Sequence, residues 1–170
     1  MSSRSPTSES RDALPPRNAG RQRVGEAKGP RAARRSHDAV ARAVDAILVV
    51  EDDPISREAM ERVLSRIGAR IYCAASAAAA WECYQRIHPK LIVSDITLGE
   101  GETGLCLMTR IRAEEAQGQG PVTTAIAITG LEGSAIREEA RRAGFDHFLA
   151  KPVDLRNLAT LAETSLTGQI

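Results

Sequence analysis

Short apolar runs alternate with longer amphipathic segments through most of this chain, and no other feature limits its fold so strongly. Five runs have the length and the aliphatic or β-branched character of strands that are buried on both faces. They occupy residues 47–50, 71–74, 91–95, 124–129 and 147–150. Segments with apolar residues at helical spacing follow them, at residues 55–67, 77–87, 104–116, 134–143 and 154–166. This alternation, with short connections, predicts an α/β fold in which helices cover both faces of a five-stranded parallel sheet.

Local signals indicate where several of these helices begin and end. Asp53 and Pro54 stand at the start of the first helix, where they are typical of an N-cap and of the first helical position. Gly68 and Gly144 stand at the predicted ends of the first and fourth helices, and Pro89 bounds the second.

The core of such a domain must be mainly aliphatic, because only 3% of the residues are aromatic. Trp81 and Tyr84 lie at helical spacing and are predicted to join this core rather than a binding site. The three cysteines, Cys73, Cys83 and Cys106, lack the spacing of a metal site, so we expect reduced, buried thiols in a cytoplasmic protein. No apolar run approaches the ~20 residues of a membrane span, and the N-terminus lacks the apolar stretch of a secretory signal.

Residues 1–44 differ in charge from the rest of the chain. They carry ten Lys or Arg against four Asp or Glu, whereas residues 45–170 carry thirteen against eighteen. Because residues 1–36 contain few large apolar side chains, we predict a disordered basic tail over 1–44, with a short helical lead-in at 38–44, and a folded domain over 45–170. An alternative is that the gene start was placed too early. The positive charge suits nucleic acid or an acidic partner, although such segments are more often simply solvated.

Ionisable or hydroxyl side chains follow four of the five predicted strands. Glu51 and Asp52 come after the first strand, Asp95 ends the third, Thr129 ends the fourth and Lys151 follows the fifth. Because the carboxyl ends of parallel strands lie along one edge of the sheet, these residues are expected to meet. Three converging carboxylates repel one another, and Mg²⁺, which prefers oxygen ligands, relieves that repulsion. Asp95 is then placed as a nucleophile for phosphoryl transfer, with the lysine neutralising charge and the threonine hydroxyl donating to a phosphoryl oxygen.

Four segments of the chain resemble the receiver domain of two-component response regulators. They are ILVVEDDPISR at 47–57, LIVSDITLG at 91–99, AIAITG at 125–130 and FLAKPVD at 148–154. Their order and spacing both agree with the family, and the resemblance covers roughly residues 45–168. It implies a flavodoxin-like, doubly wound fold with the strand order 2-1-3-4-5.

The resemblance also implies a role for each residue at the strand ends. Asp95 matches the phosphorylation site, and Thr129 and Lys151 match the hydroxyl and the lysine that assist it. The expected Mg²⁺ ligands are Glu51, Asp52, Asp95 and the backbone carbonyl of Thr97. Phe148 lies where the family has an aromatic switch residue that acts with Thr129, and the peptide bond before Pro152 is expected to be cis.

The loop after Asp95 departs from the family pattern. Receivers usually have a proline-containing loop that ends in Asp-Gly, whereas residues 98–104 read LGEGETG, one residue longer and without proline. The three glycines predict a mobile loop.

These features together predict a stand-alone receiver of a phosphorelay. Asp95 would take a phosphoryl group from a histidine kinase or a histidine phosphotransfer protein, with Mg²⁺ bound. The protein would signal to a partner by switching conformation, because no effector domain is expected after the fifth helix. It would be a phosphoprotein that catalyses only its own phosphorylation and dephosphorylation. Two alternatives remain open: a receiver-like interaction module that is never phosphorylated, and a nucleic-acid-associated protein that acts through its basic tail.

Overall fold

The computed structural model describes residues 46–99, 101–118, 121–130 and 133–168. The predicted tail over 1–44, with its lead-in at 38–44, lies outside these residues. Five strands form one parallel sheet: β1 (Ala46–Val50), β2 (Arg70–Ala74), β3 (Leu91–Asp95), β4 (Thr124–Thr129) and β5 (His147–Ala150). Their order is β2-β1-β3-β4-β5, so the predicted doubly wound topology is confirmed.

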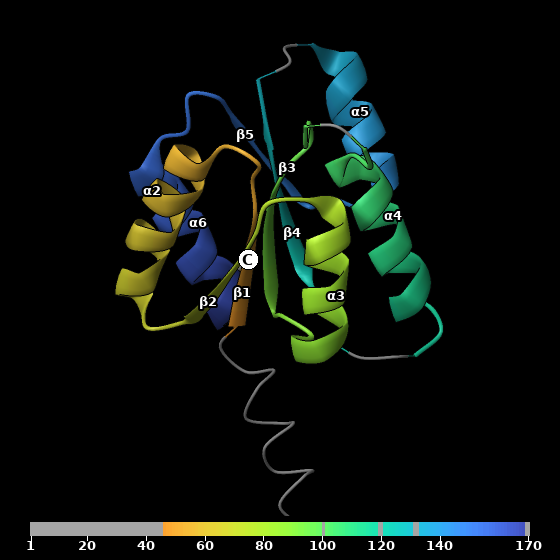
Figure 1. Cartoon of the computed structure of the whole chain (residues 1–170), viewed down its shortest axis with the longest axis horizontal. Helices are drawn as coiled ribbons and strands as arrows, with labels where there is room; N and C mark the ends of the chain where they lie inside the picture. The colour runs from red at the N-terminus through yellow and green to blue at the C-terminus, as the bar shows by residue number, and fades with distance from the viewer. Residues whose placement is uncertain (1–45, 100, 119–120, 131–132, 169–170) are drawn as a thin grey trace, which may run out of the picture. The chain divides into compact units, whose positions relative to one another are not determined.

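Helices cover both faces of this sheet (Figure 1). The α-helices of the described residues are α2 (Pro54–Leu64), α3 (Ala77–Ile87), α4 (Gly104–Glu115), α5 (Ser134–Ala143) and α6 (Leu155–Thr167), and a short 3-10 turn, η1 (Ser65–Ile67), extends α2. One face packs against α2 and α6, and the other against α3, α4 and α5.

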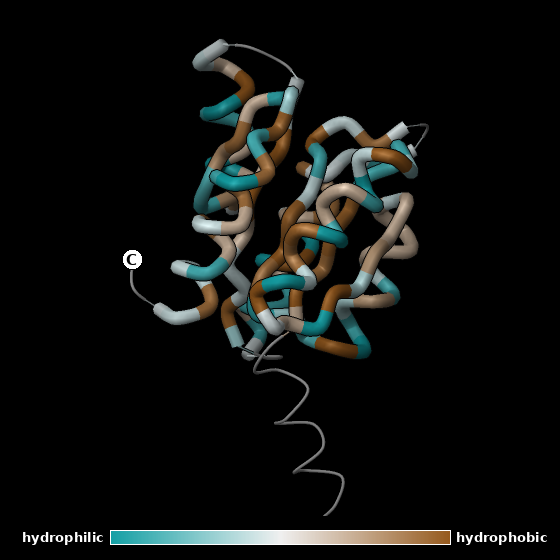
Figure 2. Tube along the Cα trace, turned by 90° about the vertical axis from the view of Figure 1, so that its left-hand side faces the viewer, coloured by the Kyte–Doolittle hydropathy of each residue, from teal (hydrophilic) through white to brown (hydrophobic). Residues whose placement is uncertain are grey.

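The sheet divides the core into two layers, one on each face. Each strand contributes to both layers, because its successive side chains point to opposite faces. Ile47 and Val49 of β1 contact the α2 and α6 side, whereas Leu48 and Val50 contact the α3 side. Burial on both faces explains why the strands read as continuous apolar runs. In Figure 2 the helices alternate between hydrophobic and hydrophilic residues, as expected of elements that bury only one face. Trp81 and Tyr84 are buried in the α3 layer, so their predicted place in the core is confirmed.

The helix ends follow the predicted signals with one addition. The Asp53 side chain caps α2 by accepting a hydrogen bond of 2.7 Å from the Ser56 backbone N–H, and Pro54 is the first helical residue. Gly68 and Gly144 end their helices in the left-handed conformation. At the end of α3, however, His88 itself takes a left-handed conformation with φ of 42°. The sequence indicated only the proline that follows.

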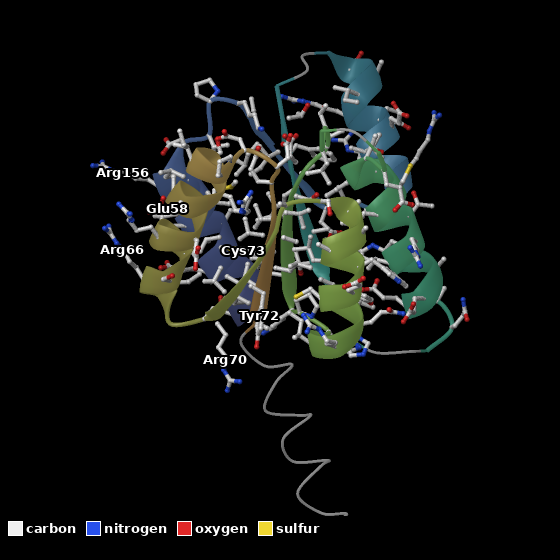
Figure 3. The ribbon with its side chains drawn as sticks, in the orientation of Figure 1. Glu58, Arg66, Arg70, Tyr72, Cys73 and Arg156 are labelled. Atoms are coloured by element: carbon white, nitrogen blue, oxygen red, sulfur yellow. The ribbon has the colours of Figure 1, made fainter. Side chains whose placement is uncertain are left out.

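The prediction of buried thiols is wrong for two of the three cysteines. All three are free, but only Cys83 is buried. Cys73 lies on β2, the edge strand, which Figure 3 shows with Arg70, Tyr72 and Cys73 labelled in succession along it. Cys106 lies on α4 and is exposed as well. Among the described residues, no helix is both long and apolar enough to cross a membrane.

Arg112 of α4 contacts the two loops that precede β4 and β5, at the opposite end of the sheet from Asp95. Its guanidinium donates hydrogen bonds of 2.7 Å to the Thr123 carbonyl and 2.7 Å to the Gly144 carbonyl. It also pairs with the carboxylates of Glu115 at 2.7 Å and Asp146 at 3.0 Å. These contacts link α4 to the segments that enter β4 and β5.

Candidate functional site

The carboxyl ends of β1 and β3 place three carboxylates at one edge of the sheet. Because β1 and β3 are neighbours in the strand order, Glu51 and Asp52 lie next to Asp95. One oxygen from each of the three side chains lies within 4.8 Å of the others. Glu51 and Asp95 are only 1% and 4% exposed, whereas Asp52 is exposed. The predicted convergence of these residues is therefore present in the structure.

Lys151, in the loop after β5, contacts two of these carboxylates. Its ammonium donates hydrogen bonds of 2.6 Å to Asp95 Oδ2 and 3.0 Å to Glu51 Oε1. Lys151 is half-buried, so these charge-assisted bonds are less weakened by water than those of an exposed pair. One ammonium nevertheless faces three carboxylates, which leaves the cluster with excess negative charge.

This arrangement shifts the pKa values of both partners. Burial raises the pKa of Glu51, and the hydrogen bond from Lys151 offsets only part of that rise. Burial by itself would lower the pKa of Lys151, but the hydrogen bonds to Asp95 and Glu51 outweigh it and raise that pKa. Lys151 is thus positively charged at neutral pH, and further positive charge beside Glu51 would favour its ionised form.

The donor set fits a hard divalent cation. Glu51 Oε2 is buried and accepts no hydrogen bond from the described residues, although the Lys151 ammonium lies 3.0 Å away. An oxygen with a free lone pair, in a cluster of oxygen donors with unneutralised charge, suits Mg²⁺. Magnesium is the ion that the sequence predicted here.

The backbone around Asp95 is held by close contacts. The Thr97 N–H donates to Asp95 Oδ1 at 2.9 Å, and the Ser94 hydroxyl donates to the Asp95 carbonyl at 2.8 Å. Gly104, at the start of α4, packs so closely that a Cβ there would lie 2.1 Å from the Asp95 carbonyl oxygen. Its N–H also donates to the Ile96 carbonyl at 2.9 Å. Gly104 begins α4, as predicted, and its close packing there leaves no room for a Cβ, which the sequence did not indicate.

The acidic pair has two further contacts that the sequence did not indicate. The Gly99 N–H donates to Asp52 Oδ2 at 3.1 Å, which joins the loop after β3 to the acidic pair. Arg57 of α2 donates from one guanidinium nitrogen to the backbone carbonyls of Glu51, at 2.7 Å, and Asp52, at 3.1 Å. An arginine on an amphipathic helix is usually expected to point into solvent. No local sequence pattern therefore indicated that Arg57 donates to the Glu51 and Asp52 carbonyls.

Thr129, at the end of β4, and Phe148, on β5, lie next to α5. The Thr129 carbonyl accepts a hydrogen bond of 2.8 Å from the Lys151 backbone N–H, and this bond fixes β4 beside the lysine. Thr129 is buried and Phe148 is half-buried, and both line a cavity of about 460 Å³ that also contacts Ser134 and Arg137. The peptide bond between Lys151 and Pro152 is cis, as predicted. The switching roles of Thr129 and Phe148 stay predictions.

Comparisons with known proteins agree with this geometry. A family model described as the response regulator receiver domain matches residues 47–163. An uncharacterized 14.6 kDa protein from Leptolyngbya boryana is 37% identical over 69% of this chain and 86% of its own length. The response regulator Rre1 of Synechocystis is 30% identical, over 72% of this chain. The transcriptional regulatory protein AruR of Pseudomonas aeruginosa is 32% identical, over 71% of this chain. The chain spans only about half the length of these last two relatives, 52% and 48%.

Solved structures show the same fold. The receiver domain of the Francisella response regulator 1452 matches with a TM-score of 0.66 and 18% identity, over 74% of this chain and 99% of that one. A CheY-like receiver domain protein from Methanospirillum hungatei matches with a TM-score of 0.64 and 24% identity, over 75% and 97% of the two chains.

Proposed function

This chain belongs to the response regulator receiver family, whose members are signalling modules, and we propose that it accepts a phosphoryl group on Asp95 from a phosphohistidine of a kinase or phosphotransfer protein. The observation that carries the proposal is the contact of the Lys151 ammonium with Asp95 Oδ2 at 2.6 Å, within the acidic cluster of Glu51, Asp52 and Asp95. A carboxylate at a strand end, with a fixed cation against it, is suited to receive a group that brings more negative charge.

In the proposed transfer, a carboxylate oxygen of Asp95 attacks the phosphorus atom. A new O–P bond forms while the P–N bond to the donor imidazole breaks, and the electron pair of that bond stays on the imidazole nitrogen. The Thr97 N–H and the Lys151 ammonium, which contact the two Asp95 oxygens, orient the carboxylate for this attack. Lys151 then pairs with a phosphoryl oxygen, and the Thr129 hydroxyl donates to another.

We further propose that Glu51, Asp52, Asp95 and the Thr97 carbonyl hold Mg²⁺. When bound, this ion neutralises charge on the transferring phosphoryl group. The carboxylates themselves fix where the ion is held. The buried Glu51 oxygen without a hydrogen bond partner among the described residues supports this assignment.

The proposed output is a shift between two conformations. An acyl phosphate adds charge and acceptor oxygens beside β4, and Thr129 and Phe148 line one cavity next to α5. Movement of Thr129 toward the phosphoryl group would free space for Phe148 to turn inward and would change the surface around β4, α5 and β5. A partner protein would read this change.

Phosphorylation with a small-molecule donor tests the proposal. We expect the parent protein to gain one phosphoryl group from acetyl phosphate and Mg²⁺, seen on a Phos-tag gel and mapped by mass spectrometry. The Asp95→Asn variant should gain none. Asp53→Asn is the matched control, because asparagine caps a helix as well as aspartate does, and it should behave as the parent. A parent that stays unmodified under strong donor conditions would instead favour the interaction-module alternative.

A further inference from the structure

Arg57 connects α2 to the backbone of both members of the acidic pair. We propose that Arg57 is a positioning residue for the cation site, because it fixes the direction in which the Glu51 and Asp52 carboxylates leave the end of β1. This inference rests on the proposed function, since it concerns the same Mg²⁺ site.

The contacts of Arg57 place it at the turn between β1 and α2. Its guanidinium donates to the Glu51 carbonyl at 2.7 Å and to the Asp52 carbonyl at 3.1 Å. Its own backbone N–H donates to the Asp53 carbonyl at 3.0 Å, within the first turn of α2. The arginine is half-buried and its donor group is a guanidinium cation, so both bonds to the carbonyls are charge-assisted.

The two hydrogen bonds from the Arg57 guanidinium lie just beyond the end of β1, where the chain leaves the sheet. The Glu51 N–H still donates to the Ala74 carbonyl of β2 at 3.1 Å, as the last contact of that residue with the neighbouring strand. Beyond it, the Glu51 and Asp52 carbonyls face α2 and accept from Arg57. A rotation of either peptide plane would swing the side chains that carry the metal-binding oxygens. Groups that orient metal ligands in this way typically contribute tenfold to a hundredfold to affinity.

The charge of Arg57 has the opposite effect. A guanidinium close to the acidic cluster repels a divalent cation, so removing its charge would by itself make Mg²⁺ bind more tightly. The sign of the change therefore distinguishes the two roles. A positioning role predicts weaker binding in a neutral variant, and a purely electrostatic role predicts tighter binding.

Magnesium titration of the full chain by isothermal calorimetry tests this prediction. We expect Arg57→Met to raise the dissociation constant for Mg²⁺ about tenfold. Arg62→Met is the matched control, because Arg62 lies on the same helix, pairs with Glu58 and is 72% exposed, and it should bind as the parent does.

Each result of the Mg²⁺ titrations either supports or overturns the positioning role of Arg57. Parental or tighter Mg²⁺ binding by Arg57→Met would overturn the positioning role alone. If the parent itself binds no Mg²⁺, the proposed function and this inference both fail. Should thermal unfolding show that Arg57→Met does not fold, Arg57→Lys carries the test. Lysine keeps the charge but carries its nitrogen on a shorter and more flexible stem, so weakening of about threefold supports positioning and unchanged affinity overturns it.

Discussion

Replacing Gly104 with alanine probes how closely the start of α4 packs against the end of β3. The added Cβ would lie 2.1 Å from the Asp95 carbonyl oxygen and 2.9 Å from the Ser94 hydroxyl oxygen. Ordinary contacts of a Cβ atom begin at 3.4 Å, and the Asp95 carbonyl oxygen belongs to the backbone, so the two backbone segments must move apart by about an ångström or more. The hydrogen bond from the Gly104 N–H to the Ile96 carbonyl would be stretched by the same movement.

The expected loss of stability follows from these contacts. Overpacking of a well-packed site costs typically ~1–3 kcal/mol. Weakening one backbone hydrogen bond adds ~1 kcal/mol. Replacing glycine with alanine also raises the free energy of unfolding by ~0.5–1 kcal/mol, because alanine restricts the unfolded chain and favours the helix. The free energy of unfolding should therefore fall by about 1–3.5 kcal/mol, which in a domain of this size lowers the melting temperature by about 5–15 °C.

Urea denaturation followed by far-UV circular dichroism measures this change. The matched control is Gly130→Ala, since a Cβ at Gly130 would meet only the Lys151 Cβ, at 3.9 Å. That variant should stay within ~0.5 kcal/mol of the parent. If Gly104→Ala is as stable as Gly130→Ala, the close approach to Asp95 does not constrain the domain and the reasoning is refuted.

Two further predictions concern charged residues. Arg112→Met should lower the free energy of unfolding by about 3 kcal/mol, because it leaves the buried Glu115 carboxylate without its cation; an unchanged urea midpoint would contradict this. Burial raises the pKa of Glu51 above 4.5, so protons compete with Mg²⁺ at a higher pH than they would at an ordinary glutamate. Calorimetric Mg²⁺ affinity should fall as the pH is lowered toward the raised pKa of Glu51, and Glu51→Gln should flatten this dependence. Without Mg²⁺, the stability that Glu51 contributes is present below its unfolded pKa near 4.5 and is lost as the pH rises through its higher folded pKa.

The fold could be predicted because burial imposes its pattern along the chain. Strands covered on both faces must be apolar throughout, and helices that bury one face must repeat at helical spacing. The meeting of Glu51, Asp95 and Lys151 followed from topology, since the ends of parallel strands share an edge of the sheet. The positions of these residues at the ends of predicted parallel strands were enough to predict that they meet.

The contacts that hold the site together could not be predicted in this way. Arg57 and Arg112 act by donating to carbonyl groups, and every residue has a carbonyl, so the sequence marks no partner. The sequence does not distinguish Gly104 from the glycines of the preceding loop. A glycine required for close packing and a glycine required for a turn are the same residue type. Cys73 was expected to be buried in a strand, but only the strand order shows that β2 lies at the edge of the sheet.

The ion pair between Glu51 and Lys151 spans 100 residues of sequence, from the end of the first strand to the end of the last. During synthesis, the acidic residues leave the ribosome long before the lysine that neutralises them. A nascent chain that has emerged only as far as β4 contains Glu51 and Asp95 but not Lys151, the lysine that contacts both carboxylates. Under the proposed function, the chain would therefore become able to accept a phosphoryl group only after its last strand has been made.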